Sequence, residues 1–196
     1  MKRLSLTVLL LLLATSCFAG FGMQIVDGPV VASAPVCSSQ TTVTILGTND
    51  DHSEILYDEG YQVGQSFSAA ESVTLYSIIV RLDSKEGTPV LTARIGTSAD
   101  LSTYTGQTDA KNVTESVGSE VELVFPAESR PTITSGITYY VGVSNSATYD
   151  NRCELSIDAN SSYTSGAYIY NTSGDMDWNL DLTYNADLYL KYKKCD

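Results

Sequence analysis

Short runs of β-branched and aromatic residues, separated by turn residues, fill most of this chain of 196 residues. Over residues 88–96, Leu91, Ala93 and Ile95 alternate with polar residues, which is the period expected of a strand with one buried face. Similar runs cover residues 41–47, 64–69, 72–83, 120–125, 137–144, 153–158, 166–171 and 187–194. Helical periodicity is absent after the N-terminal region, so the chain is predicted to be an all-β, antiparallel β-sandwich of jelly-roll type.

The first residues read as a secretory signal. Lys2 and Arg3 precede an apolar run over 4–14, which is shorter than the roughly 17–25 residues of a membrane span. Cleavage after Ala19 would release a secreted or periplasmic protein. The alternative is a lipoprotein box that ends at Cys17 and would place a lipid anchor there.

The rest of the chain has the size of one domain. We expect a signal peptide over 1–19, a lead segment over 20–40 and a β-sandwich domain over 41–196, with long polar connections at 48–63, 97–119 and 145–152. The formal net charge is −12, which argues against nucleic acid as a partner because phosphates require Lys and Arg. A membrane is expected as a partner only if Cys17 is lipidated.

Three cysteines lie beyond the signal: Cys37, Cys153 and Cys195. In an oxidising compartment one pair forms a disulfide and one thiol is left over. Cys37 precedes the first predicted strand and Cys195 ends the last, so Cys37–Cys195 is the predicted bridge if these strands are neighbours. The chain has one His and no CxxC spacing, which argues against a zinc site.

Four short motifs follow one another along the chain: VGQSFSA over 63–69, LYSIIVRLDSKEGTPVLTARIGTS over 75–98, ITSGITYYVGVS over 133–144, and Trp178 before ADLYLKY over 186–192. Together they resemble a family of secreted bacterial jelly-roll domains, described as choice-of-anchor domains or as similar to carbohydrate-binding and galactose-binding modules. The resemblance implies an extracellular β-sandwich that works by binding a ligand or by being displayed. It implies no activity and no cofactor.

The residues that carry this resemblance explain a fold rather than a site. Gly87, before Thr88 and Pro89, is expected in a tight turn, and Gly136 in the turn that enters the strand of Tyr139. The matching residues are Gln65, Phe67, Gly87, Gly136, Tyr139, Trp178 and Asp187.

Polar residues at alternate positions over 175–181 look like the start of a calcium loop. A helical calcium loop needs Gly at its sixth position and Glu at its twelfth, where this chain has Leu180 and Ala186. The intervening residues are apolar, so the stretch is predicted to be a strand with a polar outer face. Asp175 and Asp177 remain candidate ligands for Ca²⁺; the alternative is a solvated strand face.

No set of residues indicates catalysis. The cluster TNDDHSE over 48–54 has neighbouring acids and His52, but acid–base catalysis needs groups held at a fixed separation across a cleft. No GxSxG motif is present. We therefore predict that the protein is not an enzyme, and keep a glycoside-active enzyme as the last alternative.

Tyrosine dominates the aromatic residues, with 13 Tyr against one Trp and four Phe. A Tyr ring with its hydroxyl suits stacking on sugars, although Tyr is also an ordinary strand residue. The candidates for ligand binding are Tyr57, Tyr61, Tyr104, Tyr149, Tyr163, Tyr168 and Tyr170. The predicted function is a secreted, non-catalytic module that binds carbohydrate or cell-envelope glycan and needs no cofactor. The alternative is a structural subunit of a matrix, envelope or filament that binds copies of itself.

Overall fold

The computed structural model describes residues 37–46, 52–56, 61–101, 103–148, 150–158, 168–171, 179–181 and 187–196. They belong to one unit, Ser33–Asp196. Within these ranges the regular structure is β-strand, apart from a 3-10 turn at Ala127–Ser129. The prediction of an all-β protein is therefore confirmed.

Sheet 1 has eight strands and is built around the long strand β4. β15 and β8 pair with the same part of β4, β11 pairs with its last residues, and β1 extends the sheet beyond β15. All pairs are antiparallel. The strands are β1 (Gln40–Leu46), β2 (His52–Leu56), β4 (Val73–Lys85), β8 (Glu120–Val124), β9 (Thr132–Ile133), β11 (Cys153–Asp158), β14 (Asp187–Leu188) and β15 (Leu190–Cys195).

Sheet 2 has seven strands, in the order β13-β12-β3-β10-β5-β6, with β7 also paired to β5. Its pairs are antiparallel as well. The strands are β3 (Gln62–Ser68), β5 (Val90–Gly96), β6 (Gly106–Gln107), β7 (Lys111–Asn112), β10 (Thr138–Asn145), β12 (Tyr168–Asn171) and β13 (Asn179–Asp181).

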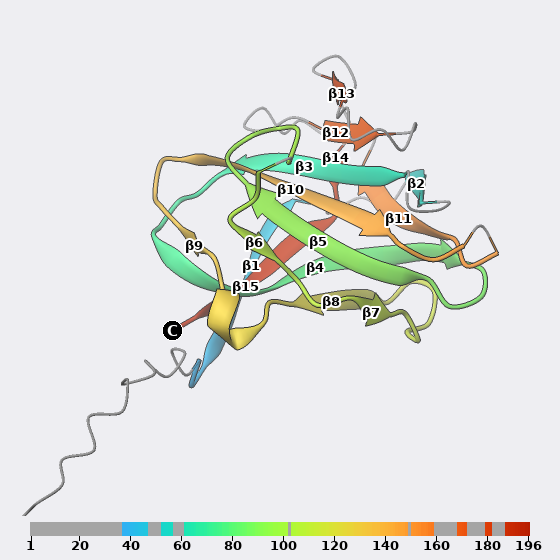
Figure 1. Ribbon diagram of the computed structural model, residues 1–196, viewed down its shortest axis with the longest axis horizontal. Coiled ribbons are helices and arrows are strands. Elements are labelled where there is room, and N and C mark those ends of the chain that lie inside the picture. Colours follow the sequence, from blue (N-terminus) through green and yellow to red (C-terminus); the bar gives the residue numbers. More distant parts are fainter. Residues whose placement is uncertain are drawn as a thin grey trace, which may run out of the picture. The chain divides into compact units, whose positions relative to one another are not determined.

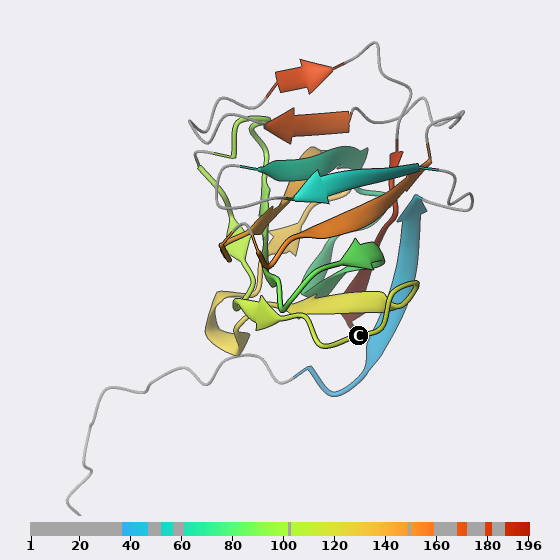
Figure 2. The same ribbon diagram turned by 90° about the vertical axis from the view of Figure 1, so that its right-hand side faces the viewer.

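The two sheets pack face to face as a β-sandwich. In Figure 1, β3, β10 and β5 lie in front of β1, β15 and β4, and the turned view of Figure 2 separates the two layers. Consecutive strands repeatedly change sheet: β4 is followed by β5, β9 by β10, and β10 by β11. Each such connection passes over an end of the sandwich, so loops from both sheets gather at these ends.

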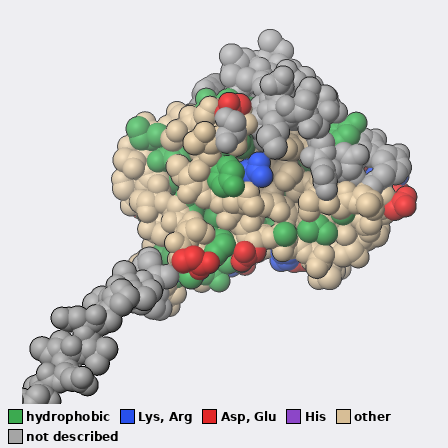
Figure 3. All heavy atoms as spheres, in the orientation of Figure 1, with side chains coloured by type: hydrophobic (Ala, Val, Ile, Leu, Met, Phe, Trp, Pro, Cys, Tyr) green, Lys and Arg blue, Asp and Glu red, His purple; other side chains and the backbone are tan. Residues whose placement is uncertain are grey.

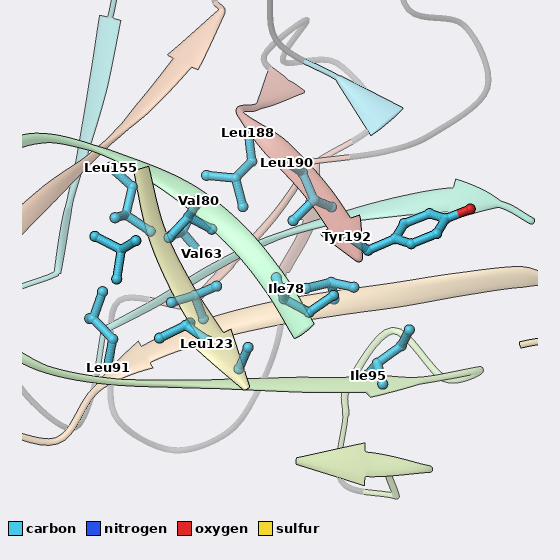
Figure 4. Close-up of a cluster of buried hydrophobic side chains, with 14 of the residues drawn as sticks. Val63, Ile78, Val80, Leu91, Ile95, Leu123, Leu155, Leu188, Leu190 and Tyr192 are labelled. Carbon is cyan, nitrogen blue, oxygen red and sulfur yellow. The ribbon is translucent and has the colours of Figure 1, made fainter. Parts of the chain in front are cut away.

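The core lies between the sheets. Figure 4 shows Val63, Leu91 and Ile95 of sheet 2 facing side chains from sheet 1, among them Ile78 and Leu123. Leu91, Ala93 and Ile95 are all fully buried, so the alternation read from the sequence is confirmed. Each large buried aliphatic side chain contributes about 1.5–3 kcal/mol through removal from water.

Two predicted turns are confirmed by glycines in the left-handed backbone region. Gly87 has φ +60° and Gly136 has φ +79°, a region that side chains disfavour. Gly136 leads into β10, where the ring of Tyr139 lies 6.2 Å from that of Phe67, measured between centroids. Two motifs that carried the family resemblance thus meet in the core.

One buried amide, Asn145, joins several strands. Its Nδ2 donates to the carbonyl oxygens of Leu56 (3.2 Å) and Asn151 (2.8 Å). Its Oδ1 accepts from the backbone N–H of Val90 (3.0 Å) and of Ala147 (3.1 Å). Because both polar atoms are fully used, the buried amide stabilises the end of the sandwich instead of destabilising it.

The predicted Cys37–Cys195 disulfide is present. It fastens β1 to β15, and Thr41 adds a hydrogen bond from its hydroxyl to the carboxylate of Asp196 (2.7 Å). Cys153 is the leftover thiol and is buried in the core, which raises its pKa to about 12. A disulfide that joins the two ends of a domain fits an oxidising compartment.

The observed strands differ from the prediction in two connections. Residues 48–63 were expected to be a polar loop. His52–Leu56 form β2 instead, because every residue of this segment pairs with a residue of β11. The expected loop 97–119 contains the short strands β6 and β7, which pair with β5.

Part of the N-terminal and C-terminal predictions cannot be compared with the structure. The signal, the lead segment up to residue 36, Asp175, Asp177 and Trp178 lie outside the described residues. Within the predicted strand over 175–185, residues 179–181 are described and form β13. The described ranges contain no helix long and apolar enough to cross a membrane.

Candidate functional site

Five of the seven strands of sheet 2 carry almost no charge. The five strands β3, β5, β6, β10 and β12 contain one charged residue, Arg94. Figure 3 shows this side of the molecule, with basic side-chain atoms beside hydrophobic ones near the centre of a mostly uncharged surface. The residues that alternate with the core, here called the sheet 2 face, are Gln62, Gly64, Ser66, Thr92, Arg94, Gly96, Gln107, Tyr140, Gly142 and Ser144.

Arg94 is held in place by uncharged neighbours. In the ladder it lies between Gly142 of β10 and Gln107 of β6. Its Nε donates to Oε1 of Gln107 (2.8 Å), and its guanidinium carbon lies 4.9 Å from the centroid of the Tyr104 ring. Within the described residues it makes no ion pair with a carboxylate. The guanidinium is thus oriented, and no carboxylate of the described part of the chain neutralises its charge.

Tyr104 reaches this position because Gly96 has no side chain. A Cβ at Gly96 would lie 2.8 Å from the carbonyl oxygen of Thr103 and 3.2 Å from Cα of Tyr104. Without it, the chain after β5 folds back over the end of the strand, where the N–H of Thr105 donates to the carbonyl of Ile95 (2.7 Å). Tyr104 stays 43% exposed.

The same loop contains a strained residue. Leu101 has φ +46°, a left-handed conformation that costs a residue with a Cβ about 1–2 kcal/mol. Its side chain is 1% exposed, so burial offsets the strain and anchors the loop. The buried Leu101 side chain and the hydrogen bond of Thr105 hold the chain on both sides of Tyr104, which reduces the flexibility that Tyr104 can lose on binding.

One part of the sheet 2 face is closed. A Cβ at Gly64 would lie 2.8 Å from Cγ1 of Ile169, and Ile169 is fully buried. Gly64, Gly142 and Ser66 are buried too. The accessible part therefore lies over β5, β6 and the adjoining edge of β10. We call it the Arg94 patch, and it consists of Thr92, Arg94, Tyr104, Gln107 and Tyr140.

The Arg94 patch offers groups for binding but none for acid–base chemistry. It has an aromatic ring that is partly exposed, a fixed guanidinium, an amide and hydroxyl groups, which together suit stacking and directional hydrogen bonds. It has no carboxylate and no imidazole. This arrangement can hold a polar ligand, and its own side chains supply no proton donor and acceptor of the kind that hydrolysis requires.

The outward side of sheet 1 is different, because two of its lysines pair with glutamates. Lys191 Nζ and the Tyr189 hydroxyl each donate to Oε1 of Glu120 at 2.6 Å. Oε2 of Glu122 accepts from Lys193 Nζ (2.8 Å), and its Oε1 accepts from Ser77 Oγ (2.7 Å).

These contacts shift the pKa values of the ionised groups. The hydrogen bond from Lys191, followed by that from Tyr189, lowers the pKa of Glu120. The hydrogen bond to Glu120 raises the pKa of Lys191. Glu120 and Lys191 are therefore each stabilised in the charged form by the other. Their contacts join β15 to β8 and thus contribute to the stability of sheet 1.

The sequence-predicted tyrosines have different positions. Tyr104 is exposed on the Arg94 patch, while Tyr61 is half-buried and packs against the core. Tyr168 and Tyr170 belong to β12, opposite Gln65 and Val63 of β3, and their side chains are outside the described part. Tyr57, Tyr149 and Tyr163 lie outside the described residues.

Four residues of the patch, Thr92, Arg94, Gln107 and Tyr140, were missed by sequence reasoning. Tyr140 alternates with the core residues Tyr139 and Val141, so its parity could have placed it on the outward face. Arg94 was read as a polar position of a strand, without a role. Nothing in the sequence indicates that Gln107 lies opposite Arg94, because that follows from the pairing of β5 with β6.

The metal prediction has no counterpart in the described part of the chain. There, no group of three or more His, Cys, Asp or Glu residues is arranged to hold an ion. Asp175 and Asp177 remain outside these residues, as do Asn49, Asp50 and Asp51 of the TNDDHSE cluster. His52 of this cluster lies in β2.

No protein-family model matches the chain, and no curated protein matches it in sequence. The resemblance to secreted jelly-roll domains therefore rests on the motifs quoted above.

Proposed function

We propose that this protein is a secreted, non-catalytic carbohydrate-binding module, and that the Arg94 patch is its sugar-binding surface. The observation that carries the proposal is the pairing of an exposed aromatic ring, Tyr104, with an oriented guanidinium on an otherwise uncharged sheet face. Sugars present apolar ring faces beside hydroxyl groups, so a ring for stacking and fixed donors for hydrogen bonds are complementary to them.

The architecture supports a jelly-roll module. Strands that follow one another in the chain are exchanged between the two sheets, as happens when a Greek-key ribbon is wound into two layers. The resemblance of the VGQSFSA and ITSGITYY segments to secreted jelly-roll domains points the same way. Secretion is supported by the disulfide between Cys37 and Cys195 and by the apolar N-terminal run after Lys2 and Arg3.

A glycan array followed by titration calorimetry tests this function. We expect the wild-type protein to bind at least one oligosaccharide, and Tyr104→Ala to weaken that binding at least tenfold. Tyr189→Ala is the matched control, because it removes the same side chain from the outward side of sheet 1. Thermal melting checks that both variants are folded. Absence of any glycan binding, or an equal loss in both variants, would contradict the proposal.

A second candidate function is self-assembly through β1. Among the described residues β1 pairs only with β15, so its other edge offers backbone groups for another strand. Its sequence QTTVTIL has no charge, no Pro and no Gly, and thus lacks the usual features that prevent edge-to-edge pairing. The disulfide and the bond from Thr41 to Asp196 hold it in place.

Sedimentation velocity over a range of protein concentrations tests this second function. Two copies joined along β1 would form a continuous antiparallel sheet with Thr side chains opposite one another. We expect the double variant Thr42→Lys/Thr44→Lys to be monomeric where the wild type associates. A wild type that stays monomeric at high concentration, or a double variant that associates equally, would exclude β1 as an assembly edge.

A further inference from the structure

We propose that the Arg94 patch selects acidic sugars, and that the guanidinium of Arg94 binds the carboxylate of a uronic acid residue through two parallel hydrogen bonds. This inference rests on the glycan-binding function proposed above and names the chemical class of its ligand. It follows from the charge, the orientation and the surroundings of Arg94.

The charge of Arg94 is unusual for its position. The chain as a whole has a formal net charge of −12. Strands β3, β5, β6, β10 and β12 nevertheless contain one cationic residue, Arg94, and no anionic residue. A neutral sugar would be bound equally well by amides and hydroxyls, which need no counter-charge. A half-buried guanidinium that lacks a carboxylate among the described residues is complementary to an anion.

The orientation of Arg94 selects the kind of anion. A guanidinium has five N–H donors in one plane. The Nε–H is used by Gln107, and the guanidinium carbon lies over the Tyr104 ring, 4.9 Å from its centroid. The donors on the two terminal nitrogens remain for a ligand, side by side in a fork that matches the two oxygens of a carboxylate. The anchored loop supplies this arrangement before binding, so little entropy is lost.

Lys191 and Lys193 of sheet 1 do not provide a comparable site. Lys191 and Lys193 each contact a carboxylate of β8, at 2.6 and 2.8 Å. An incoming anion would have to displace that carboxylate. Arg94 requires no such displacement, because Gln107 and Tyr104 are neutral and can keep their contacts when a ligand binds.

The ring of Tyr104 fits the same ligand. A uronic acid carries its carboxylate on a pyranose ring, so a carboxylate held at Arg94 brings apolar C–H groups of the ligand close to the patch. Tyr140 adds a second aromatic side chain, since it is adjacent to Gly96 in the ladder and diagonal to Arg94, about 7–8 Å away on the same face. Two rings around one cation suit an oligosaccharide better than a small free acid.

Titration calorimetry with matched oligosaccharides tests the inference. The probes are oligomers of galacturonate, of guluronate and of glucuronate-containing disaccharides, each beside its carboxyl-reduced, neutral form and beside a sulfated neutral oligosaccharide. We expect at least one acidic oligomer to bind more than tenfold tighter than its reduced form. The preference should weaken as salt is added, because ionic contacts at a surface are screened.

Arg94→Met is the decisive variant. It keeps an unbranched side chain and removes the charge, so we expect it to lose the preference for acidic sugars while it keeps a weak affinity for the neutral forms. Arg94→Lys should restore only part of the preference, because an ammonium group cannot form the fork. Arg152→Met is the matched control: it makes the same change in a side chain paired with Glu86, away from the patch.

The outcomes separate the two proposals. If the wild type binds neutral and acidic forms equally through Tyr104, the acidic-sugar inference is wrong and the glycan-binding function stands. Equal binding of the sulfated oligosaccharide would show that the patch reads charge alone, which overturns the carboxylate assignment. If Arg94→Met keeps the acidic preference, Arg94 is not the selecting residue. If the wild type binds no glycan, both proposals fall.

Discussion

The two outward faces of this sandwich contain basic residues in opposite situations. On sheet 1, Lys191 and Lys193 of β15 contact Glu120 and Glu122 of β8, across the intervening strand β4. On sheet 2, Arg94 is held by an amide and an aromatic ring. The charges of Lys191 and Lys193 are neutralised within the protein and stabilise sheet 1. The charge of Arg94 is oriented by neutral groups, so we expect it to be available to a ligand.

The paired face also covers apolar area. Ile79 points outward from β4, opposite Lys191 on one side and Glu122 on the other, and yet it is only 3% exposed. The aliphatic stems of long charged side chains can cover such a residue while their charged ends stay in water. Exposed ion pairs contribute only about 0–1 kcal/mol each, so the main role of this network is to enclose Ile79 and Ser77.

The largest expected effect comes from releasing β1 at the edge of sheet 1. Replacing both Cys37 and Cys195 by Ser removes a cross-link between residues 158 apart in sequence, which is worth about 5 kcal/mol by loop entropy. Guanidinium unfolding measures the loss. Sugar affinity of the Arg94 patch, measured well below the melting temperature, should be unchanged. A parallel fall in affinity would show that the two faces are not independent.

Removing Ile79 should have the next largest effect. We expect Ile79→Ala to lower the free energy of unfolding by about 2 kcal/mol, the low end for a buried aliphatic residue, because flexible side chains can partly fill the space. Thr92→Ala on the Arg94 patch is the control and should stay within about 0.5 kcal/mol of the wild type. Equal values for the two variants would mean that the cover over Ile79 is loose.

Exchanging one polar partner on each face sharpens the contrast. Glu122→Gln weakens the contacts to Lys193 and Ser77, so we expect a loss of about 1 kcal/mol in stability and no change in sugar affinity. Gln107→Ala frees the guanidinium of Arg94, so stability should hardly change while affinity for acidic sugars falls severalfold. Chemical unfolding and calorimetry of both variants check this; the reverse pattern would contradict the division of roles between the faces.

The smallest expected effect is the pH dependence of the Glu120–Lys191 pair. The pKa of Glu120 is lower in the folded protein than its ordinary value of 4.5, so its contribution is complete above about pH 4.5 and is lost as the pH falls through the folded-state pKa. The pKa of Lys191 is raised above 10.5, so its contribution is complete below that pH and is lost as the pH rises through the folded-state pKa.

An NMR titration of the Glu120 carboxyl carbon measures this directly. Lys191→Met should move the midpoint up towards 4.5. Lys85→Met is the control, since Lys85 donates to the backbone carbonyl of Val113 instead. A midpoint that is the same in the wild type and in Lys191→Met would show that the ion pair is not formed in solution.

Much of the fold was predictable from local patterns. The alternation in 88–96 gave β5 and its buried residues, and the glycines at 87 and 136 gave two turns. β2 was missed because HSEIL is short and half polar, and it becomes a strand only through its pairing with β11. Asn145 was missed for a similar reason: two of its four hydrogen-bond partners, Leu56 and Val90, lie on strands that are distant in sequence.

Of the tyrosines named from the sequence, one, Tyr104, belongs to the Arg94 patch. An excess of Tyr in a predicted secretory β-sandwich led to a sugar-binding hypothesis that included Tyr104, the exposed ring of the patch. Arg94 and Gln107 were not included, because neither residue indicates a binding site alone. Their proposed role depends on the hydrogen bond between them. They are separated in sequence by the loop that Gly96 and Leu101 shape, and they meet through the register of β5 and β6.

The sequence by itself determined which residues face inward, because strand side chains alternate strictly and the apolar ones repeat every second position. It also brought Cys37 and Cys195 to the two ends of one domain. Only the tertiary structure decided which cation is neutralised. Arg94 and Lys191 are alike in sequence, each a basic residue at a polar position of a strand. The register sets Gln107 beside Arg94, whereas Lys191 reaches Glu120. The alternation of side chains along a strand determines which face of the sheet a residue lies on, whereas the pairing of strands determines which residues lie beside it.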